Sequence, residues 1–243
     1  MIHFPEIRAR GFTLRLRELT IGQAVDIALR PEHLEQAGTT AFLRAAVIDP
    51  ETDPARWRVG ERTLAVAHYL ACVLNDPDFS VGGGAYSDYL VPETAPVPEF
   101  ADLGEILGEH WRMRHLDGRM AEAVERLDLD PITGRGKWLA AMSAGQMYRD
   151  GEADPADMTD GELDEWLEKR ARDWCALPES EFEAMLLGYF RGRDILTHLF
   201  RLDADDQGLA CLPDREDAGL PPARFSVRSG LGPWARAMAR RAD

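Results

Sequence analysis

The stretch FTLRLRELTIGQAVDIAL, residues 12–29, changes its hydrophobic period halfway along. In its first half, Phe12, Leu14 and Leu16 alternate with polar residues, which is the period of a half-buried β-strand. A T-x-x-Q sequence at Thr20 then forms a capping box, which begins helices by satisfying free backbone N–H groups. The apolar residues after it recur at helical spacing, so the stretch predicts a strand or small hairpin that leads into a helix.

Helical patterns continue along most of the remaining chain. A second capping box begins at Thr159, and Gly38 and Gly118 interrupt two of the apolar stripes. The stripe of residues 102–127 contains Leu103, Ile106, Leu107, His110 and Trp111. We therefore expect a mainly α fold of one or more multi-helix domains, with a small N-terminal β-strand or hairpin. The further helices are expected near residues 31–38, 40–48, 57–74, 102–127, 137–148, 159–175, 178–200 and 234–241.

Residues 76–100 are the least regular part of the sequence. They contain Pro77, three consecutive glycines and three further prolines. A connection of this length and composition is long for a compact domain, which predicts a long Gly/Pro-rich loop or linker. It would join an N-terminal domain of a strand and helices, residues 1–75, to a C-terminal helical domain, residues 101–243.

The composition restricts the kinds of partner. The chain has 243 residues, of which 45% are hydrophobic, enough to form a core. Its net charge of −15 is uneven: the acidic segment 150–217 holds 20 Asp and Glu against 7 Lys and Arg, whereas residues 218–243 hold 5 Arg against 1 Asp. Because an acidic surface repels phosphate, we expect no nucleic-acid partner. The longest apolar run, residues 64–74, is about half of a membrane span, so we expect no membrane partner.

Asp203 and Asp205, followed by Gly208, come closest to a metal motif. Carboxylates at positions one and three and a glycine at position six match part of a calcium-binding loop. The twelfth position, however, is Asp214, which is short for a bidentate ligand, and Pro213 precedes it. We expect a solvated turn here. A small acidic metal-dependent bacterial enzyme or regulator that uses this segment is the alternative function.

Other motifs for catalysis or cofactor binding are weak. The sequence TGRGKW, residues 133–138, lacks the first glycine and the final Ser or Thr of a phosphate-binding loop. His68 and Cys72 have the i,i+4 spacing of zinc ligands, but they lie in an apolar helix without an evident second ligand pair. A G-x-S-x-G nucleophile motif does not occur. We therefore expect no catalytic residue, no metal ligand and no cofactor, and a protein that is not an enzyme.

Two parts of the chain resemble proteins of tailed bacteriophages. LRLRELTIGQAVDIAL, with the later helix ERTLAVAHYLACVL, resembles the N-terminal region of tail and baseplate-hub assembly proteins. GEILGEHWRMRHLDGRM and LPESEFEAMLLGYF are similar to segments of virion-associated tail proteins. The resemblance implies a non-enzymatic tail or baseplate protein, either a structural component of the virion or a tail assembly chaperone. It also implies a location in the virion tail or the host cytoplasm.

The expected mode of action is protein–protein contact through apolar surfaces. The partners would be other tail or baseplate proteins, and a homo-oligomer is possible. The strand residues Phe12, Leu14 and Leu16 are the first candidates for partner binding, because an edge strand can pair with another chain. Trp234 and Met238 are the second, because they lie four residues apart in a short, basic, amphipathic helix at the end of the chain.

Overall fold

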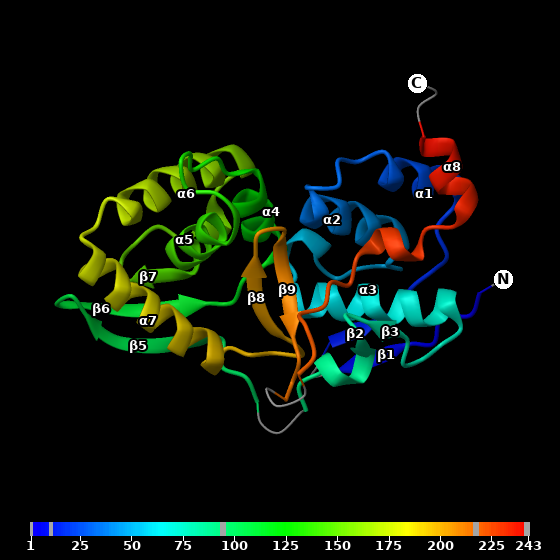
Figure 1. The fold of residues 1–243 in the computed structure, drawn as a ribbon, viewed down its shortest axis with the longest axis horizontal. Helices are drawn as coiled ribbons and strands as arrows, with labels where there is room; N and C mark the ends of the chain where they lie inside the picture. The colour runs from blue at the N-terminus through cyan, green and yellow to red at the C-terminus, as the bar shows by residue number, and fades with distance from the viewer. Residues whose placement is uncertain (1, 10–11, 93–95, 216–218, 241–243) are drawn as a thin grey trace.

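The computed structural model describes residues 2–9, 12–92, 96–215 and 219–240, which form two lobes with a hairpin between them (Figure 1). The fold is mixed α/β, with eight α-helices (49% of the residues) and four small sheets (18%) in the part described. The prediction of a mainly α fold is therefore wrong. Three hairpins replace segments that were expected to be helix, loop or turn, as shown below.

The first lobe contains the strand-to-helix stretch that the sequence predicts. Its elements are β1 (Ile7–Ala9), β2 (Phe12–Leu14), α1 (Ile21–Ala28), α2 (Glu35–Ala46), the 3₁₀ helix η1 (Pro54–Arg56) and α3 (Val59–Leu74). Strands β1 and β2 form the predicted small hairpin, in which Ile7 pairs with Leu14. The capping box is also confirmed: the backbone N–H of Gln23 donates to Thr20 Oγ1 at 3.3 Å, and that of Thr20 donates to Gln23 Oε1 at 2.9 Å.

Helix α2 continues through a point where a break was expected. Gly38 and Thr40 both lie within it, so two short helices are replaced by one. The side chain of Thr39 donates to the carbonyl of Glu35 at 3.0 Å, one turn earlier, so this hydroxyl bonds within the helix. A single glycine in a helix costs only about 1 kcal/mol, which tertiary packing readily offsets.

Residues 76–100 are not one long loop where the structure describes them. They contain β3 (Ser80–Val81), β4 (Gly84–Ala85) and the 3₁₀ helix η2 (Tyr86–Tyr89). Tyr89 is fully buried, and its hydroxyl donates to the carbonyls of Gly82 at 3.1 Å and Pro221 at 2.9 Å. This segment therefore packs on the first lobe, and the expectation of a long Gly/Pro-rich loop is corrected. Residues 93–95 lie outside the described part.

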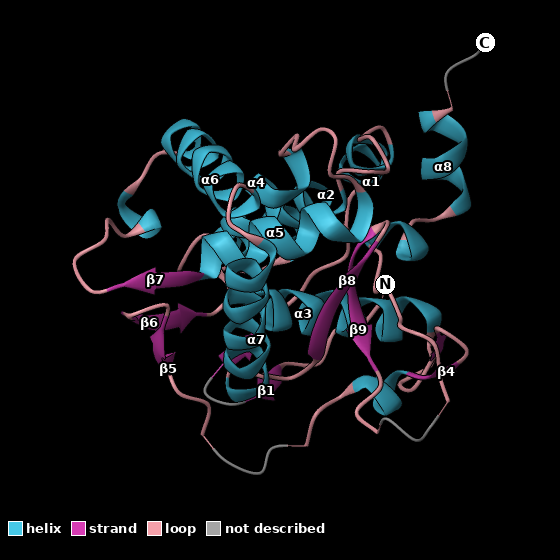
Figure 2. Cartoon of the chain, turned by 60° about the vertical axis from the view of Figure 1, so that its left-hand side comes forward, coloured by secondary structure: helices cyan, strands magenta, loops and turns pink. Residues whose placement is uncertain are grey.

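The second lobe packs four helices around a three-stranded sheet (Figures 1 and 2). The strands are β5 (Phe100–Ile106), β6 (Glu109–Arg114) and β7 (Met147–Arg149), with β6 in the middle. The helices are α4 (Gly118–Arg126), α5 (Gly134–Gln146), α6 (Asp160–Cys175) and α7 (Glu179–Ile195), with the 3₁₀ helix η3 (Pro155–Asp157) before α6. The capping box predicted at Thr159 is confirmed, because its side chain accepts from the backbone N–H of Glu162.

The segment from residue 102 to 115, predicted to be helical, is the β5–β6 hairpin. Leu107 and Gly108 both have positive φ, 54° and 80°, which makes the two-residue turn that twisted hairpins prefer. Buried Ala101 and Leu103 on β5 and Trp111 and Met113 on β6 show a period of two. The helical reading failed because a bulge between Asp102 and Gly104 shifts this period and makes the apolar spacing look like a helix.

The last part of the chain crosses from the second lobe to the first. Strands β8 (Arg201–Asp205) and β9 (Gly208–Leu212) form an antiparallel hairpin between the lobes, and Leu202 packs against both hydrophobic cores (Figure 1). The 3₁₀ helix η5 (Val227–Gly230) and α8 (Pro233–Ala239) follow on the first lobe. Phe225, Leu231 and Ala235 are buried in the core that also contains Leu14. Residues 101–243 therefore do not pack as one unit.

Candidate functional site

Helix α8 carries the two most exposed large apolar side chains among the described residues. Trp234 is 77% exposed and Met238 is 63% exposed, and their i,i+4 spacing places them on the same side of the helix. Ala235, which is buried, attaches the helix to the first lobe. Pro233 favours the start of this helix, because its fixed φ suits a first turn and an N–H at this position would have no partner within the helix.

Helix α1 lies against α8 and adds two further apolar side chains (Figure 1). Ile21 and Leu29, at the two ends of α1, are each about half exposed. We call the exposed side chains of Ile21, Leu29, Trp234 and Met238 the α1–α8 surface. Scattered exposed apolar residues are normal, whereas large ones grouped together mark protein-binding surfaces, and Trp234 and Met238 form such a pair on one helix.

The α1–α8 surface is fixed to the lobe by arginine side chains. Arg228 of η5 donates to the carbonyls of Ala28, at 3.1 Å, and Arg30, at the end of α1. Arg236 of α8 in turn donates to the carbonyls of Arg228 and Ser229, both at 3.2 Å. These contacts join α1, η5 and α8 into one preformed unit, so little order has to be gained on binding.

The strand residues predicted to bind a partner lie elsewhere. Leu14 is 1% exposed and Leu16 is also buried, and both side chains pack in the core of the first lobe. Both side chains are therefore covered by their own lobe in this conformation, whereas the sequence pattern made them candidates for partner binding. The backbone of Phe12 pairs with Ala9, and its side chain lies outside the described part of the chain.

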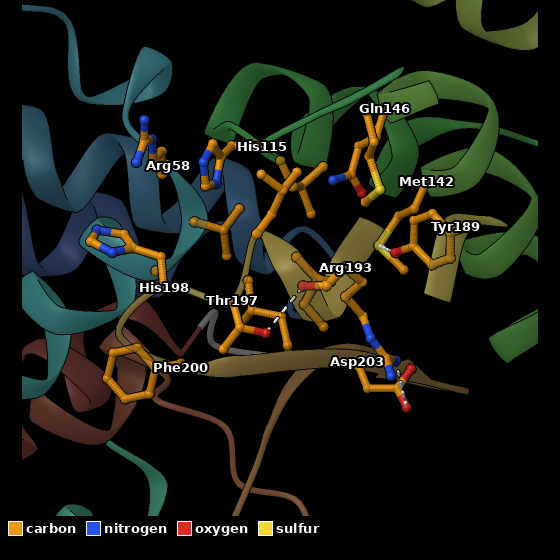
Figure 3. A pocket seen from close by; sticks show the side chains of 17 residues that line it. Arg58, His115, Met142, Gln146, Tyr189, Arg193, Thr197, His198, Phe200 and Asp203 are labelled. Carbon is orange, nitrogen blue, oxygen red and sulfur yellow. Dashed lines mark hydrogen bonds and ion pairs between the residues drawn. The ribbon is translucent and has the colours of Figure 1, made fainter. Parts of the chain in front are cut away.

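A small cavity lies at the junction of the two lobes (Figure 3). Its volume is about 60 Å³, room for a few water-sized groups, and most of its lining is apolar. Figure 3 shows Arg58, His115 and His198 on one side of it and Met142, Gln146 and Tyr189 on the other. No sequence pattern indicates this cavity, because its lining comes from α3, α5, α7, β6, β8 and β9, which lie far apart in the chain and meet in the folded protein.

The ionisable groups around this cavity are held by neighbours of the chain itself. The ring of His115 bonds the carbonyl of Pro98 through Nε2 at 2.9 Å, and burial lowers the pKa of this histidine. His198 Nε2 lies 3.8 Å from Glu61 Oε1, longer than a hydrogen bond. The hydroxyl of Thr197 donates to the carbonyl of Arg193 at 3.1 Å, so its proton is bonded within the chain. We assign no reaction to this arrangement.

Glu125 of α4 forms a contact between the lobes that the sequence did not reveal. Its carboxylate accepts from the backbone N–H groups of Gln36, at 2.8 Å, and Ala37, at 3.2 Å. It therefore caps α2, whose own N-cap residue, Leu34, makes no side-chain cap. Burial raises the pKa of Glu125 to about 7. The sequence signal for this contact is that the N-cap position of α2 is not Ser, Thr, Asp or Asn, so the cap has to come from another part of the chain.

Arg62 of α3 lies beside this cap and is 1% exposed. Its Nη2 atom donates to the carbonyl of Gln36 at 2.8 Å and to Thr40 Oγ1 at 2.9 Å, and burial lowers its pKa to about 10. Gly118, the first residue of α4, leaves the space that the guanidinium occupies, since a Cβ there would lie 1.3 Å from Arg62 Nη1. Arg62 and Glu125 thus join α2, α3 and α4, and their role is structural.

The calcium-loop alternative has no support in the structure. Asp203 and Asp205 lie on strand β8, where Asp203 is 3.4 Å from Arg135 and 3.7 Å from Arg193, and Asp205 pairs with Arg224. Carboxylates already paired with arginines are poor ligands for a cation. Over the residues that the structure describes, no three His, Cys, Asp or Glu side chains are grouped to hold a metal ion.

Comparison with protein-family models, curated proteins and solved structures finds no match for this chain. Among the helices described, none has the length and apolar character needed to span a bilayer. The function therefore has to be argued from the surface of the molecule and from the sequence patterns given above.

Proposed function

We propose that this protein acts without catalysis, by binding other proteins through the α1–α8 surface, as a component or assembly factor of a phage tail or baseplate. The observation that carries the proposal is the exposure of Trp234 and Met238 on a helix held rigidly to the lobe. Tryptophan is enriched among the residues that dominate protein interfaces. A large apolar side chain gains roughly 1.5–3 kcal/mol on full burial, so several together supply a useful binding energy.

The phage context comes from the resemblance of residues 14–29 and 61–74 to tail and baseplate-hub assembly proteins. It makes other tail or baseplate proteins the proposed partners, and the virion tail or the host cytoplasm the proposed location. The net charge of −15 favours a protein partner over a nucleic acid. The proposal requires no cofactor.

Particle composition and a gene deletion test the proposal together. Mass spectrometry of purified particles should find the protein if it is a structural component. If it is an assembly factor, particles should lack it but tails should fail to form in its absence. Complete, infectious tails made without the gene would contradict both forms of the proposal.

The α1–α8 surface is tested by a matched pair of variants. Trp234→Ala combined with Met238→Ala should reduce tail formation as strongly as deletion of the gene. Leu107→Ala is the control, because Leu107 is also half exposed but lies in the β5–β6 turn of the other lobe. Equal tail yields from the two variants would remove the α1–α8 surface from the proposal.

A further inference from the structure

A surface groove lies at the junction of the two lobes, next to the small cavity described above. Its volume is about 350 Å³, within the range of roughly 300–1,000 Å³ that is usual for small-molecule sites, and such sites often lie between domains. Arg58, His115 and Gln146 line both the groove and the cavity, so the groove lies directly outside the cavity wall. Figure 3 shows Arg58 and His115 side by side at this place.

Four arginines line this groove, two from each lobe. Arg56 of η1 and Arg58, the N-cap residue of α3, belong to the first lobe, whereas Arg114 of β6 and Arg119 of α4 belong to the second. We call the groove that these four side chains line the arginine groove. Its arginines stand out in a chain whose net charge is −15. Guanidinium groups suit phosphate and carboxylate ligands, because two of their N–H groups can bond two oxygens at once.

The two arginines of the second lobe are held by their own chain. Arg114 Nη1 lies 2.5 Å from Asp154 Oδ1, and its guanidinium stacks on the ring of Tyr148, 4.3 Å from the ring centre. Arg119 pairs with Asp160 at 3.0 Å. These carboxylates balance the charge of both arginines, so the second lobe provides a fixed wall of the groove.

The two arginines of the first lobe have no carboxylate partner. Arg56 Nη1 donates to the carbonyl of Ala156 at 3.2 Å, which is a neutral acceptor. Across the described residues, the guanidinium of Arg58 makes no hydrogen bond and no ion pair. The carboxylate of Glu61 accepts from the backbone N–H of Arg58 at 3.0 Å and not from its side chain. Arg56 and Arg58 therefore keep donors that a ligand can use.

Carboxylates also line the arginine groove, and two of the three are already bonded. Asp154, which pairs with an arginine of the groove, also accepts from the backbone N–H of Ala156 at 3.0 Å. Asp117 caps α4 by accepting from the backbone N–H of Met120 at 2.8 Å. Glu99 is exposed and has no ion pair within the part of the chain that the structure describes. Two guanidinium groups without a carboxylate partner thus outweigh one free carboxylate, which leaves an excess of positive charge.

A second groove of nearly equal volume, about 360 Å³, provides a comparison. It is lined by one arginine, Arg15, and by three carboxylates, those of Asp49, Glu51 and Glu61. The side chain of Arg15 is exposed and, like that of Arg58, makes no ion pair with the described residues. Because carboxylates predominate here, we expect this second groove to repel anions.

We propose that the arginine groove binds a small molecule with two negative charges, carried by a phosphate or by a dicarboxylate. Arg56 and Arg58 bond its oxygens, and the side chains of the second lobe line the rest of the site. Because the contacts come from both lobes, the bound ligand stabilises their junction. The site shares no residue with the α1–α8 surface, so this inference goes beyond the proposed function and does not depend on it.

Isothermal titration calorimetry of the full chain tests the inference with two probes, inorganic phosphate and succinate, and with sodium chloride of equal ionic strength as the blank. One molecule of phosphate or succinate should bind per chain, and the probe that binds more tightly shows which of the two groups the groove takes. Arg58→Gln should weaken binding by about tenfold or more, as expected for a lost hydrogen bond to a charged group. Arg15→Gln is the matched control and should bind like the wild type.

Three results would overturn the inference. They are heats no larger than the blank for both probes, an Arg58→Gln chain that binds as tightly as the wild type, and an equal loss of binding in Arg15→Gln. Arg58→Lys keeps the charge but not the paired N–H groups, so its affinity should be intermediate. Binding by Arg58→Lys that is no better than binding by Arg58→Gln would also count against the proposal.

Thermal unfolding separates loss of the site from loss of the fold. Without ligand, Arg58→Gln should melt at the temperature of the wild type, because its guanidinium has no partner among the described residues. The probe that binds should raise the melting temperature of the wild type and of Arg15→Gln, but not that of Arg58→Gln. A rise of the same size in all three proteins would contradict the proposed site.

Discussion

At the level of single residues, buried charged side chains contribute to the junction of the two lobes. Glu125 caps a helix of the opposite lobe, and Arg62 bonds α2 from a position with almost no solvent contact. Glu35 and Glu122 add like charge near Glu125, although burial is the largest cause of its raised pKa. A buried carboxylate is stabilising when it is paired and costly when it is charged without enough partners.

Glu125 should make stability depend on pH. Its pKa is raised from 4.5 to about 7 on folding, so the folded chain binds the proton more tightly than the unfolded chain. The stabilisation is complete below pH 4.5 and is lost as pH rises through 7. The free energy of unfolding of the wild type, relative to Glu125→Gln, should fall by up to about 3 kcal/mol over this window. Urea unfolding at a series of pH values measures this difference. If the free energy of unfolding changes with pH by the same amount in both proteins, the effect of Glu125 is ruled out.

Gly118 should not tolerate a side chain. A Cβ at this position would meet Arg62 Nη1 at 1.3 Å and the carbonyl oxygen of Ala55 at 2.7 Å, so the buried guanidinium would have to leave its partners. Gly118→Ala should lower the free energy of unfolding by about 3–5 kcal/mol. Gly161→Ala, in α6 with nothing within 4 Å of the new Cβ, should change it little or raise it by up to about 1 kcal/mol. Equal effects at both sites would refute the steric argument.

At the scale of elements, the same kind of apolar side chain has opposite roles on a strand and on a surface helix. The alternation of Leu14 and Leu16 marks the strand, but their side chains complete the core of the first lobe. Trp234 and Met238 also follow a helical pattern, yet only Ala235 between them is buried. An amphipathic pattern identifies the apolar face of an element and does not say whether that face meets its own chain or a partner.

Leu14 should therefore act through stability and not through partner binding. Leu14→Ala leaves a cavity in the core, so the free energy of unfolding should fall by about 2–5 kcal/mol. Leu29→Ala, at a half-exposed position of the α1–α8 surface, should change it by less than about 0.5 kcal/mol. Chemical denaturation of both variants makes the comparison. A Leu14→Ala protein as stable as the wild type would show that this side chain does not support the core, and the strand face would again be a candidate for partner binding.

At the scale of the whole molecule, the chain closes its first lobe with its last residues. Phe225 and Leu231 are buried in a core whose other members lie mainly before residue 90, and the β8–β9 hairpin contacts both cores. A domain boundary near residue 100 assigns these C-terminal residues to the second lobe. The order of residues along the chain does not show that a late segment packs back on the first lobe.

Removing residues 219–243 should open the first lobe while the second stays folded. Limited proteolysis followed by mass spectrometry should find new early cleavage sites within residues 12–92 and unchanged protection of residues 100–195. The physical reason is that the loss uncovers the apolar faces of α1 and α3 against which η5 and α8 pack. If the shortened chain resists proteolysis within residues 12–92 as well as the full chain does, this account of the core is contradicted.

The elements whose signals are local could be predicted from the amino-acid pattern alone. The β1–β2 hairpin, the capping boxes at Thr20 and Thr159, and helices such as α3 and α6 follow from patterns within a few residues. Long-range packing, in contrast, determines that residues 100–114 pair as strands, that Leu14 is in the core while Trp234 is on the surface, and that Glu125 caps a distant helix. Burial, strand pairing and inter-lobe caps depend on residues far apart in the chain, whereas capping and helical spacing depend on immediate neighbours.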